Sequence, residues 1–311
     1  DEGGLTKEFF SLITEKLFDP AYGMFQMQEE TGVLWLNPGS LESDTDFMLV
    51  GLLLSLAVYN HVLVDVPFPR VLWKKLLGKP LNQTDLFDLS PEMADGLQKL
   101  LSYDGPDSVE DVFCLTFEAG FRFCGEQHTV ELKPNGSSIP VSNLNRREYV
   151  QLYVDHILSS SIQRQFEAFR AGFLALFHPS GLLRLLSPRE LEVLACGSQA
   201  LDFHKLQAVA QYGGGYTAQS TVIEWFWQVV HEMSEDDRKK LLKFVTGSDR
   251  SPIGGLSKLN FVIQRQGPDS IQLPTSHTCF NVLLLPEYTS RGKLRDRVMT
   301  AIANAEGFGL Q

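Results

Sequence analysis

The apolar positions along the chain follow a mainly helical spacing. They recur every three to four residues over most segments, as on one face of an amphipathic helix. Ser-Pro at 90–91 and Ser-Pro-Arg-Glu at 187–190 are typical helix starts, and Thr6 is a candidate cap for the first helix. The pattern predicts helices over residues 7–18, 47–64, 71–77, 90–103, 146–158, 162–177, 187–196, 203–212, 217–233, 234–246 and 290–305.

Shorter apolar runs bounded by turn residues predict strands. A hairpin is expected from residues 25–28 and 33–36, with Thr31-Gly32 at its turn. Further strands are expected at 112–117, 128–132, 139–141, 260–264 and 281–285. The glycines at 213–215 disfavour regular structure there. The first three of these further strands would form a small β patch inside a helical region.

One apolar segment is long enough to be either a membrane span or a core helix. Residues 47–64 are strongly apolar, but Ser55, Asn60 and His61 interrupt the run. A spanning helix needs about 20 nearly uninterrupted apolar residues. We therefore expect a fully buried core helix and no membrane association.

Length, composition and charge indicate a globular protein that does not bind nucleic acid. The 311 residues suggest one large domain or two ordinary ones, and a hydrophobic content of 43% with 21% charged residues is typical of a globular protein. The formal net charge is -11. Nucleic-acid binding through phosphates needs a concentrated basic face, so we expect no nucleic-acid partner.

Cysteine usage indicates a reducing compartment. Cys114, Cys124, Cys196 and Cys279 are sparse, and no two form a C-x-x-C pair. A disulfide framework or a structural zinc site is not expected, and we expect a cytoplasmic, or also nuclear, protein. No signal peptide opens the chain, and the first residue is not a methionine, so we expect a piece of a longer protein.

Known phosphate, metalloprotease and serine-hydrolase motifs do not occur in the sequence. The triple glycine at Gly213 does not follow a predicted strand, so phosphate binding is not expected there. The seven histidines are scattered without metal-ligand spacing. We expect neither a cofactor nor a metal.

Cys279 is the remaining candidate for chemistry. His277 precedes it by two residues, and in extended backbone such positions share a face, so the imidazole could lie beside the thiol. A thiolate is the reactive form of cysteine. A buried, inert cysteine at a strand end is the other interpretation, and spacing alone leaves both open.

A set of spaced motifs resembles the HECT domain, the catalytic module of one class of ubiquitin-protein ligases. The resemblance covers the whole chain and is greatest for the subfamily of the ligase affected in Angelman syndrome. It is carried by Asp1-Glu2-Gly3-Gly4, Lys7-Glu8-Phe9-Phe10, Asn143-Leu144-Asn145-Arg146, Gln165-Phe166, Phe169-Arg170, Gly172-Phe173, Cys196-Gly197-Ser198, Gly214-Gly215-Tyr216, Phe244-Val245-Thr246-Gly247-Ser248 and Leu273-Pro274-Thr275-Ser276-His277-Thr278-Cys279-Phe280-Asn281.

The resemblance implies an α+β fold with two lobes. A mainly helical N-lobe with a small β patch would span 1–196, without the family's opening helices, and would bind a ubiquitin-conjugating enzyme. A flexible hinge would cover 197–199, and a smaller α/β C-lobe 200–311. Cys279 would accept ubiquitin as a thioester and transfer it to a substrate lysine, as a step in ubiquitination and protein degradation. We expect substrate choice to lie in segments outside this chain.

The same resemblance assigns roles to further residues. His277 and Thr278 flank the nucleophile, and His277 is expected to shape the loop because no Asp or Asn partner is visible to orient it as a base. Asp65 and Glu8 match acidic positions, and Phe308 matches an aromatic residue near the C-terminus, all linked to transfer in the family. Ordinary surface charge, or a tail residue packed on its own lobe, is the alternative for these three.

Two more groups complete the expected site. The apolar groove for the conjugating enzyme would consist of Met93, Leu97, Tyr103, Phe113, Leu115 and Tyr149, although their helical spacing also suits ordinary core positions. The hinge would consist of Gly197, Ser198 and Gln199, with a helix C-cap as an equal explanation for the glycine. A cysteine hydrolase acting on ubiquitin esters and an inactive binding scaffold for conjugating enzymes are the alternative functions.

Overall fold

The computed structural model describes residues 4–123, 126–177, 181–198, 200–252 and 254–304. Contacts divide the chain into two compact units. The N-terminal unit contains Glu15–Tyr59 and Val66–Glu192, and the C-terminal unit contains Asp1–Thr14, Asn60–Asp65 and Val193–Gln311. Each unit is described by itself below.

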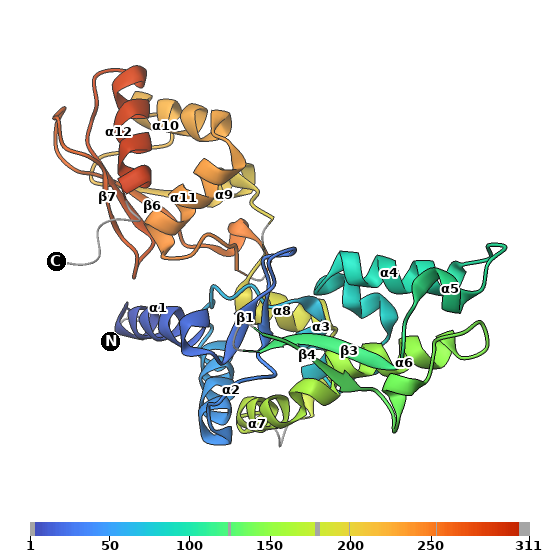
Figure 1. The fold of residues 1–311 in the computed structure, drawn as a ribbon. Coiled ribbons are helices and arrows are strands. Elements are labelled where there is room, and N and C mark those ends of the chain that lie inside the picture. The colour runs from blue at the N-terminus through green and yellow to red at the C-terminus, as the bar shows by residue number, and fades with distance from the viewer. Residues whose placement is uncertain (1–3, 124–125, 178–180, 199, 253, 305–311) are drawn as a thin grey trace. The chain divides into compact units, whose positions relative to one another are not determined.

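The N-terminal unit is mainly helical, with two small hairpins (Figure 1). Its helices are α1 (Gly4–Leu17, which enters it from the other unit), α2 (Asp44–Tyr59), α3 (Arg70–Leu76), α4 (Pro91–Ser102), α5 (Val109–Phe113), α6 (Arg146–Leu158), α7 (Gln163–Leu174) and α8 (Pro188–Cys196, which leaves it). Its strands are β1 (Phe25–Met27), β2 (Leu34–Leu36), β3 (Glu118–Phe123) and β4 (Glu126–Glu131), paired β1 with β2 and β3 with β4, both antiparallel.

Helix α2 is the centre of this unit. Its buried residues share one face, at the i, i+3, i+4 spacing of an amphipathic helix. Met48 and Leu49 on the other side are 46% and 47% exposed, so the expectation of a fully buried helix is wrong, because only one face packs against the rest of the unit. In the described part of the chain, no helix combines the length and the apolar character needed to cross a bilayer. The helix ends at Tyr59 rather than Val64, because Asn60 begins a turn and His61 takes a positive φ of 57°.

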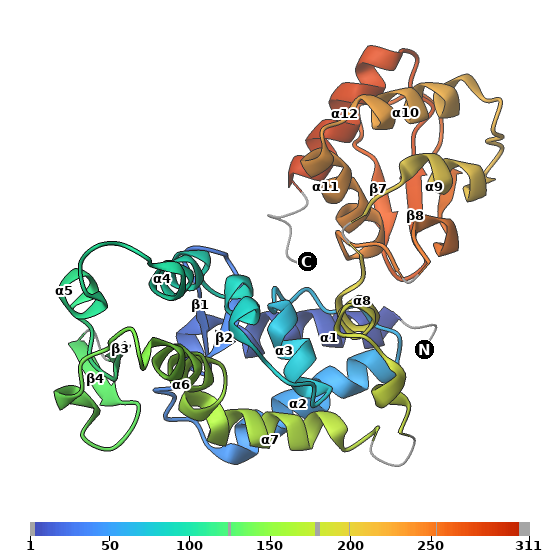
Figure 2. The same cartoon turned by 90° about the vertical axis from the view of Figure 1, so that its right-hand side faces the viewer.

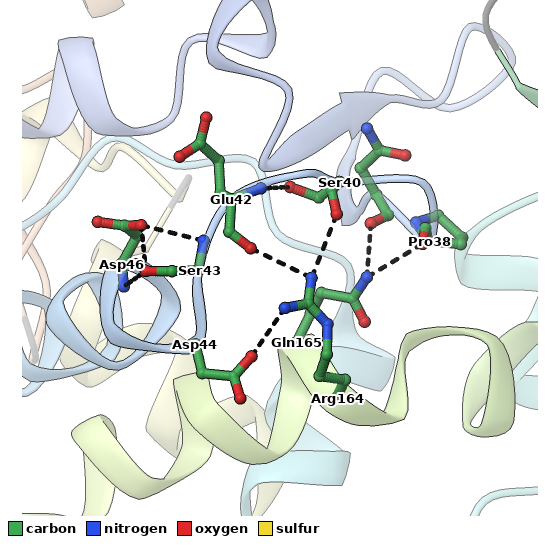
Figure 3. Close-up of polar contacts among 9 residues, drawn as sticks. Pro38, Ser40, Glu42, Ser43, Asp44, Asp46, Arg164 and Gln165 are labelled. Carbon is green, nitrogen blue, oxygen red and sulfur yellow. Dashed lines mark hydrogen bonds and ion pairs between the residues drawn. The ribbon is translucent and has the colours of Figure 1, made fainter.

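A polar cluster joins the start of α2 to α7 (Figure 3). Arg164 of α7 forms an ion pair with Asp44 at 2.8 Å and donates to the backbone oxygens of Ser40 and Glu42. The buried Gln165 donates to the backbone oxygens of Asn37 and Pro38 at 3.2 and 3.0 Å. These bonds satisfy carbonyl groups of the loop that precedes α2, so they hold that loop against α7.

The C-terminal unit contains a four-stranded sheet with the order β5-β6-β8-β7. Strands β5, β6 and β8 run parallel, and β7 runs antiparallel to β8. Figure 2 shows helices grouped around this sheet. The elements are α9 (Phe203–Val209), β5 (Gln211–Gly213), α10 (Thr221–Glu232), α11 (Glu235–Thr246), β6 (Val262–Arg265), β7 (Thr275–His277), β8 (Val282–Leu285) and α12 (Arg291–Asn304).

The core of the C-terminal unit forms between the sheet and its helices. Ile263 and Leu283 of the sheet are buried with Phe226 of α10 and with Leu294 and Val298 of α12. Parallel neighbours such as β6 and β8 need a crossover between them. Here that crossover is made by the loop and by β7, the edge strand that leads to Cys279.

Several expected elements differ from the structure. The segment expected as a strand at 112–117 begins as the end of α5, and the strand starts only at Glu118. Residues 139–141 contribute a single bridge, between Thr116 and Pro140, because proline has no N–H for a ladder. Thr6 lies inside α1 and does not precede it.

The region around the triple glycine also differs from the expectation. Helix α9 ends at Val209, and Gln211–Gly213 form strand β5, so the triple glycine does follow a strand. Gly214 and Gly215 leave the strand with positive φ values of 66° and 99°. Strand β7 at Thr275–His277 was not expected at all.

Candidate functional site

Cys279 lies in the four-residue connection between β7 and β8. The backbone N–H of Phe280 donates to the His277 oxygen at 3.1 Å, and that of Asn281 donates to the Thr278 oxygen at 3.4 Å. These two bonds close residues 278–281 into a tight hairpin loop. Cys279 is a free, half-buried cysteine within this loop.

The loop rests on the C-terminal end of α11. The hydroxyl of Ser276 in β7 donates to the Phe244 oxygen at 2.5 Å. Gly247 caps α11 with a φ of 82°, and a Cβ added there would lie 3.9 Å from the Thr278 Cβ. The sequence motifs contain both Ser276 and Gly247, but only the fold shows that these distant motifs touch. Neither residue was among the expected site residues.

The loop that carries the thiol contacts the end of α11 through Ser276 and Thr278. Within the described ranges, no hydrogen bond or ion pair joins the Cys279 sulfur to another side chain. The site therefore suits a reaction in which positioning matters more than thiolate stabilisation.

His277 does not share an extended strand face with Cys279, so the geometric premise of the sequence argument is wrong. Strand β7 ends at His277, and residues 278–280 form a turn. The reason is the pairing of His277 with Val282, which leaves the four residues between them as the connection. The His277 and Thr278 side chains are both exposed, and no hydrogen bond links the imidazole to another described side chain.

The three remaining residues assigned to transfer are Asp65, Glu8 and Phe308, and the structure describes the side chain of Asp65 alone among them. Asp65 is exposed and ends the Asn60–Asp65 segment, which belongs to the C-terminal unit. The Val64 N–H of that segment donates to the Ala195 oxygen at 2.9 Å. Glu8 lies in α1, but its side chain is outside the description, and Phe308 lies outside the described residues. Their roles stay predictions.

The residues expected to bind a conjugating enzyme gather at one end of the N-terminal unit, around α4, α5 and α6 (Figure 1). The rings of Tyr103 and Phe113 meet edge to face with centroids 5.5 Å apart. Arg146 donates to the Tyr103 oxygen at 2.7 Å and so holds the end of α4. Half-buried side chains in this set are Met93, Tyr103, Phe113 and Leu115.

Two members of the same set are core residues. Leu97 is 7% exposed and Tyr149 is 3% exposed. The Tyr149 ring packs against Phe117, and burial, with Tyr153 as a smaller cause, raises the pKa of Tyr149 to about 12. These two side chains can support an interface from beneath, while the half-buried four can contact a partner directly.

The expected hinge is bonded to the C-terminal unit at its first two residues. Gly197 has a φ of 74°, and its N–H donates to the Val193 oxygen at 2.9 Å. Both features are those of a helix C-cap, which was the alternative explanation for this glycine. Ser198 and the fully buried Ser251 exchange two backbone hydrogen bonds of 2.8 and 2.9 Å. Gln199 lies outside the described residues. A hinge role for 197–199 stays a prediction.

No group of three or more His, Cys, Asp or Glu side chains within the described part of the chain is arranged to hold a metal ion. Cys114 and Cys279 are free cysteines.

Comparison with known proteins shows the family. Residues 11–311 match the model of the HECT-domain (ubiquitin-transferase) family. The chain is 43% identical over 325 residues to the probable E3 ubiquitin-protein ligase HECTD2 of Mus musculus, covering all of this chain and 42% of the relative. It is 41% identical over 310 residues to the probable E3 ubiquitin-protein ligase HERC4 of Homo sapiens, covering all of this chain and 29% of the relative.

A fungal relative extends the comparison. The probable E3 ubiquitin-protein ligase HUL4 of Eremothecium gossypii is 39% identical over 326 residues, again over all of this chain and 39% of the relative. The chain thus spans less than half the length of these curated relatives. Their names do not single out the Angelman-syndrome subfamily, and that finer assignment is not supported by them. The chain belongs to the family of HECT-domain ubiquitin transferases.

Proposed function

We propose that Cys279 is the acceptor of ubiquitin in a ubiquitin-protein ligase. The observation that carries the proposal is a free, half-buried thiol in the β7–β8 loop of a chain that belongs to this transferase family. The thiol would take ubiquitin from a conjugating enzyme and pass it to a lysine of a substrate protein. The HECT family supports these classes of partner, while the particular conjugating enzymes and substrates are part of the proposal.

The first step exchanges one thioester for another. The Cys279 thiolate attacks the carbonyl carbon that joins ubiquitin to the cysteine of the conjugating enzyme. A new C–S bond forms, the old one breaks, and the conjugating enzyme leaves as a thiolate. Because the two thioesters are similar in energy, this step needs an accessible thiol and correct placement more than strong electrostatic activation. Cys279, a free and half-buried cysteine in a short loop, fits that requirement.

The second step forms an amide. A lysine amine attacks the Cys279 thioester carbon, the C–N bond forms and Cys279 leaves as a thiolate. The attacking nitrogen must lose a proton, so a base near the amine assists the step. Asp65 is an exposed carboxylate, and it is proposed, with Glu8 and Phe308, to assist this step on the resemblance alone.

The proposal extends to the binding surface and the cellular location. The half-buried Met93, Tyr103, Phe113 and Leu115 would contact the conjugating enzyme. A cytoplasmic, or also nuclear, location rests on the sparse cysteines of the sequence. We assign no subfamily, although the resemblance over the whole chain suggested that of the Angelman-syndrome ligase.

A loading assay tests the proposal. The protein is mixed with ubiquitin, activating enzyme, ATP and a panel of conjugating enzymes, and adducts are resolved with and without reductant. The wild-type protein should form a reductant-sensitive adduct, Cys279→Ala none, and Cys279→Ser an adduct that survives reductant because it is an oxygen ester. Cys114→Ala is the matched control, since Cys114 is also a free cysteine and is exposed.

Three outcomes would contradict the proposal. A reductant-sensitive adduct on Cys279→Ala would place the thioester elsewhere. Cleavage of a ubiquitin-ester probe without any conjugating enzyme would favour a cysteine hydrolase. Binding of a conjugating enzyme without any adduct on the wild-type protein would favour an inactive scaffold.

A further inference from the structure

The last residue of the Cys279 loop adopts an unusual backbone conformation. Asn281 has a φ of 54°, in the left-handed region that most L-residues avoid. It occupies the position where the loop must turn back into β8. Its N–H donates to the Thr278 oxygen, and its own oxygen accepts from the Val262 N–H of β6 at 3.1 Å. Asn281 therefore closes the loop on one side and anchors it to the sheet on the other.

The side-chain amide of Asn281, unlike its backbone, forms no hydrogen bond with another described residue. Its Oδ1 is buried and has no hydrogen-bond partner among the described residues. A buried acceptor without a partner disfavours the folded loop. The fit of asparagine to this position is thus explained by its backbone, because Asn tolerates the left-handed conformation that only Gly adopts more readily.

We propose that Asn281 is a positioning residue for ubiquitin transfer, acting through its left-handed backbone conformation and not through its amide. The conformation fixes the closing bond to Thr278 and so the direction in which the Cys279 sulfur is presented. Thioester exchange depends on placing the thiol against a carbonyl held by another protein, and a small displacement of the sulfur is costly in rate. The inference rests on the proposed function of Cys279.

A role of the Asn281 backbone predicts one order of Cys279 loading rates among variants, and a role of its side-chain amide predicts another. Asn281→Gly keeps the conformation and removes the unpaired oxygen. Asn281→Ala is disfavoured in it by about fivefold to thirtyfold in population, and the β-branched Asn281→Val more so. Loading of Cys279 should be as fast in Asn281→Gly as in the wild type, about fivefold or more slower in Asn281→Ala, and slower still in Asn281→Val.

The experiment measures single-turnover loading from a preformed conjugating-enzyme thioester. In parallel, iodoacetamide alkylation of the Cys279-bearing peptide is followed by mass spectrometry, and urea unfolding shows that each variant is folded. Alkylation by this small reagent requires an accessible thiol but no particular direction. A positioning role therefore predicts slower loading in Asn281→Ala with an alkylation rate within about twofold of the wild type.

The outcomes are distinct. Slow loading by Asn281→Gly, equal to that of Asn281→Ala, would assign the effect to the amide and overturn the proposal. Equal loading by all variants, or a parallel loss of alkylation and loading in Asn281→Ala, would also overturn it. If the wild-type protein forms no reductant-sensitive adduct, the proposed function fails, and the role of Asn281 in it fails too. If the wild type loads and the variants do not differ, only the inference on Asn281 fails.

Discussion

At the scale of single residues, a pair of stacked histidines joins α9 to α10 in the C-terminal unit. The rings of His204 in α9 and His231 in α10 lie 3.9 Å apart with an interplanar angle of 10°. A ring nitrogen of His231 lies 2.7 Å from Gln207 Oε1, and Arg238 donates to the His231 oxygen. Burial lowers the pKa of His231, and the positive charges of His204 and Arg238 lower it further.

This pair predicts a loss of stability in mild acid. Because the folded-state pKa of His231 lies below its unfolded value of about 6.5, neutral His231 favours folding. That contribution is fully present above pH 6.5 and is lost as the pH falls below it. The free energy of unfolding in urea should therefore drop more between pH 7.5 and pH 5.5 for the wild type than for His231→Gln. Equal drops in the two proteins would contradict the assignment.

Local residue patterns predicted two of the three named helix starts. Ser90 and Ser187 cap α4 and α8 through bonds to residues three positions on, so the information lies within one turn of helix, whereas Thr6 lies inside α1. The same kind of signal was overlooked at Ser108, whose hydroxyl accepts from the Asp111 N–H and starts α5. The β-forming tendency of Val112 and Phe113 led to a strand prediction that this cap overrides.

At the scale of elements, α2 and α7 pack with their backbones in contact. A Cβ added to Gly51 in α2 would overlap the Phe169 oxygen and lie 2.8 Å from the Phe173 nitrogen. A Cβ added to Gly172 in α7 would overlap the Met48 oxygen. The backbones of α2 and α7 can approach this closely only because glycine, which has no Cβ, occupies both positions.

Substituting one of these glycines should therefore destabilise the protein strongly. We expect Gly51→Ala to lower the free energy of unfolding by about 3 kcal/mol or more, because two helices must separate to accommodate the methyl group. Gly96 in α4 is the matched control, since an added Cβ meets nothing within 4 Å. Gly96→Ala should raise stability by about 0.4–1 kcal/mol. Chemical unfolding measures both, and equal effects would refute the close contact.

Strand order was beyond the reach of sequence patterns. Residues 260–264 and 281–285 were expected as strands, and β6 and β8 occupy nearly these positions. Their parallel pairing, with Val262 opposite Val282, joins segments twenty residues apart. The edge strand β7 has only three residues, of which two are exposed, so no alternation of apolar and polar positions could indicate it.

At the scale of the whole molecule, a large buried cluster of the C-terminal unit lies within one stretch of chain. The buried cluster runs from Phe203 to Ile302 and contains residues from the sheet and from α9, α10, α11 and α12. Ser198, just before it, is bonded to Ser251 within the same unit. A domain with its own contiguous core can in principle fold alone.

We therefore expect a fragment of residues 198–311 to fold by itself. It should show a helical circular dichroism spectrum and one cooperative thermal transition, because its core residues are all present. The same fragment with Phe226→Asp is the control, since Phe226 is fully buried and a carboxylate there would abolish the transition. A fragment that melts without cooperativity would show that residues 1–14 or 60–65 are needed for the fold.

The sequence by itself determined the starts of α4, α8 and α11, the α+β class and the family, because these depend on neighbours within a few residues or on the residues of short motifs. Only the tertiary structure decided the order β5-β6-β8-β7, the contact of Gly51 with α7, and the support of the Cys279 loop by the end of α11. Each of these joins residues far apart in the chain, and their pairing follows from packing and geometry that no local pattern records.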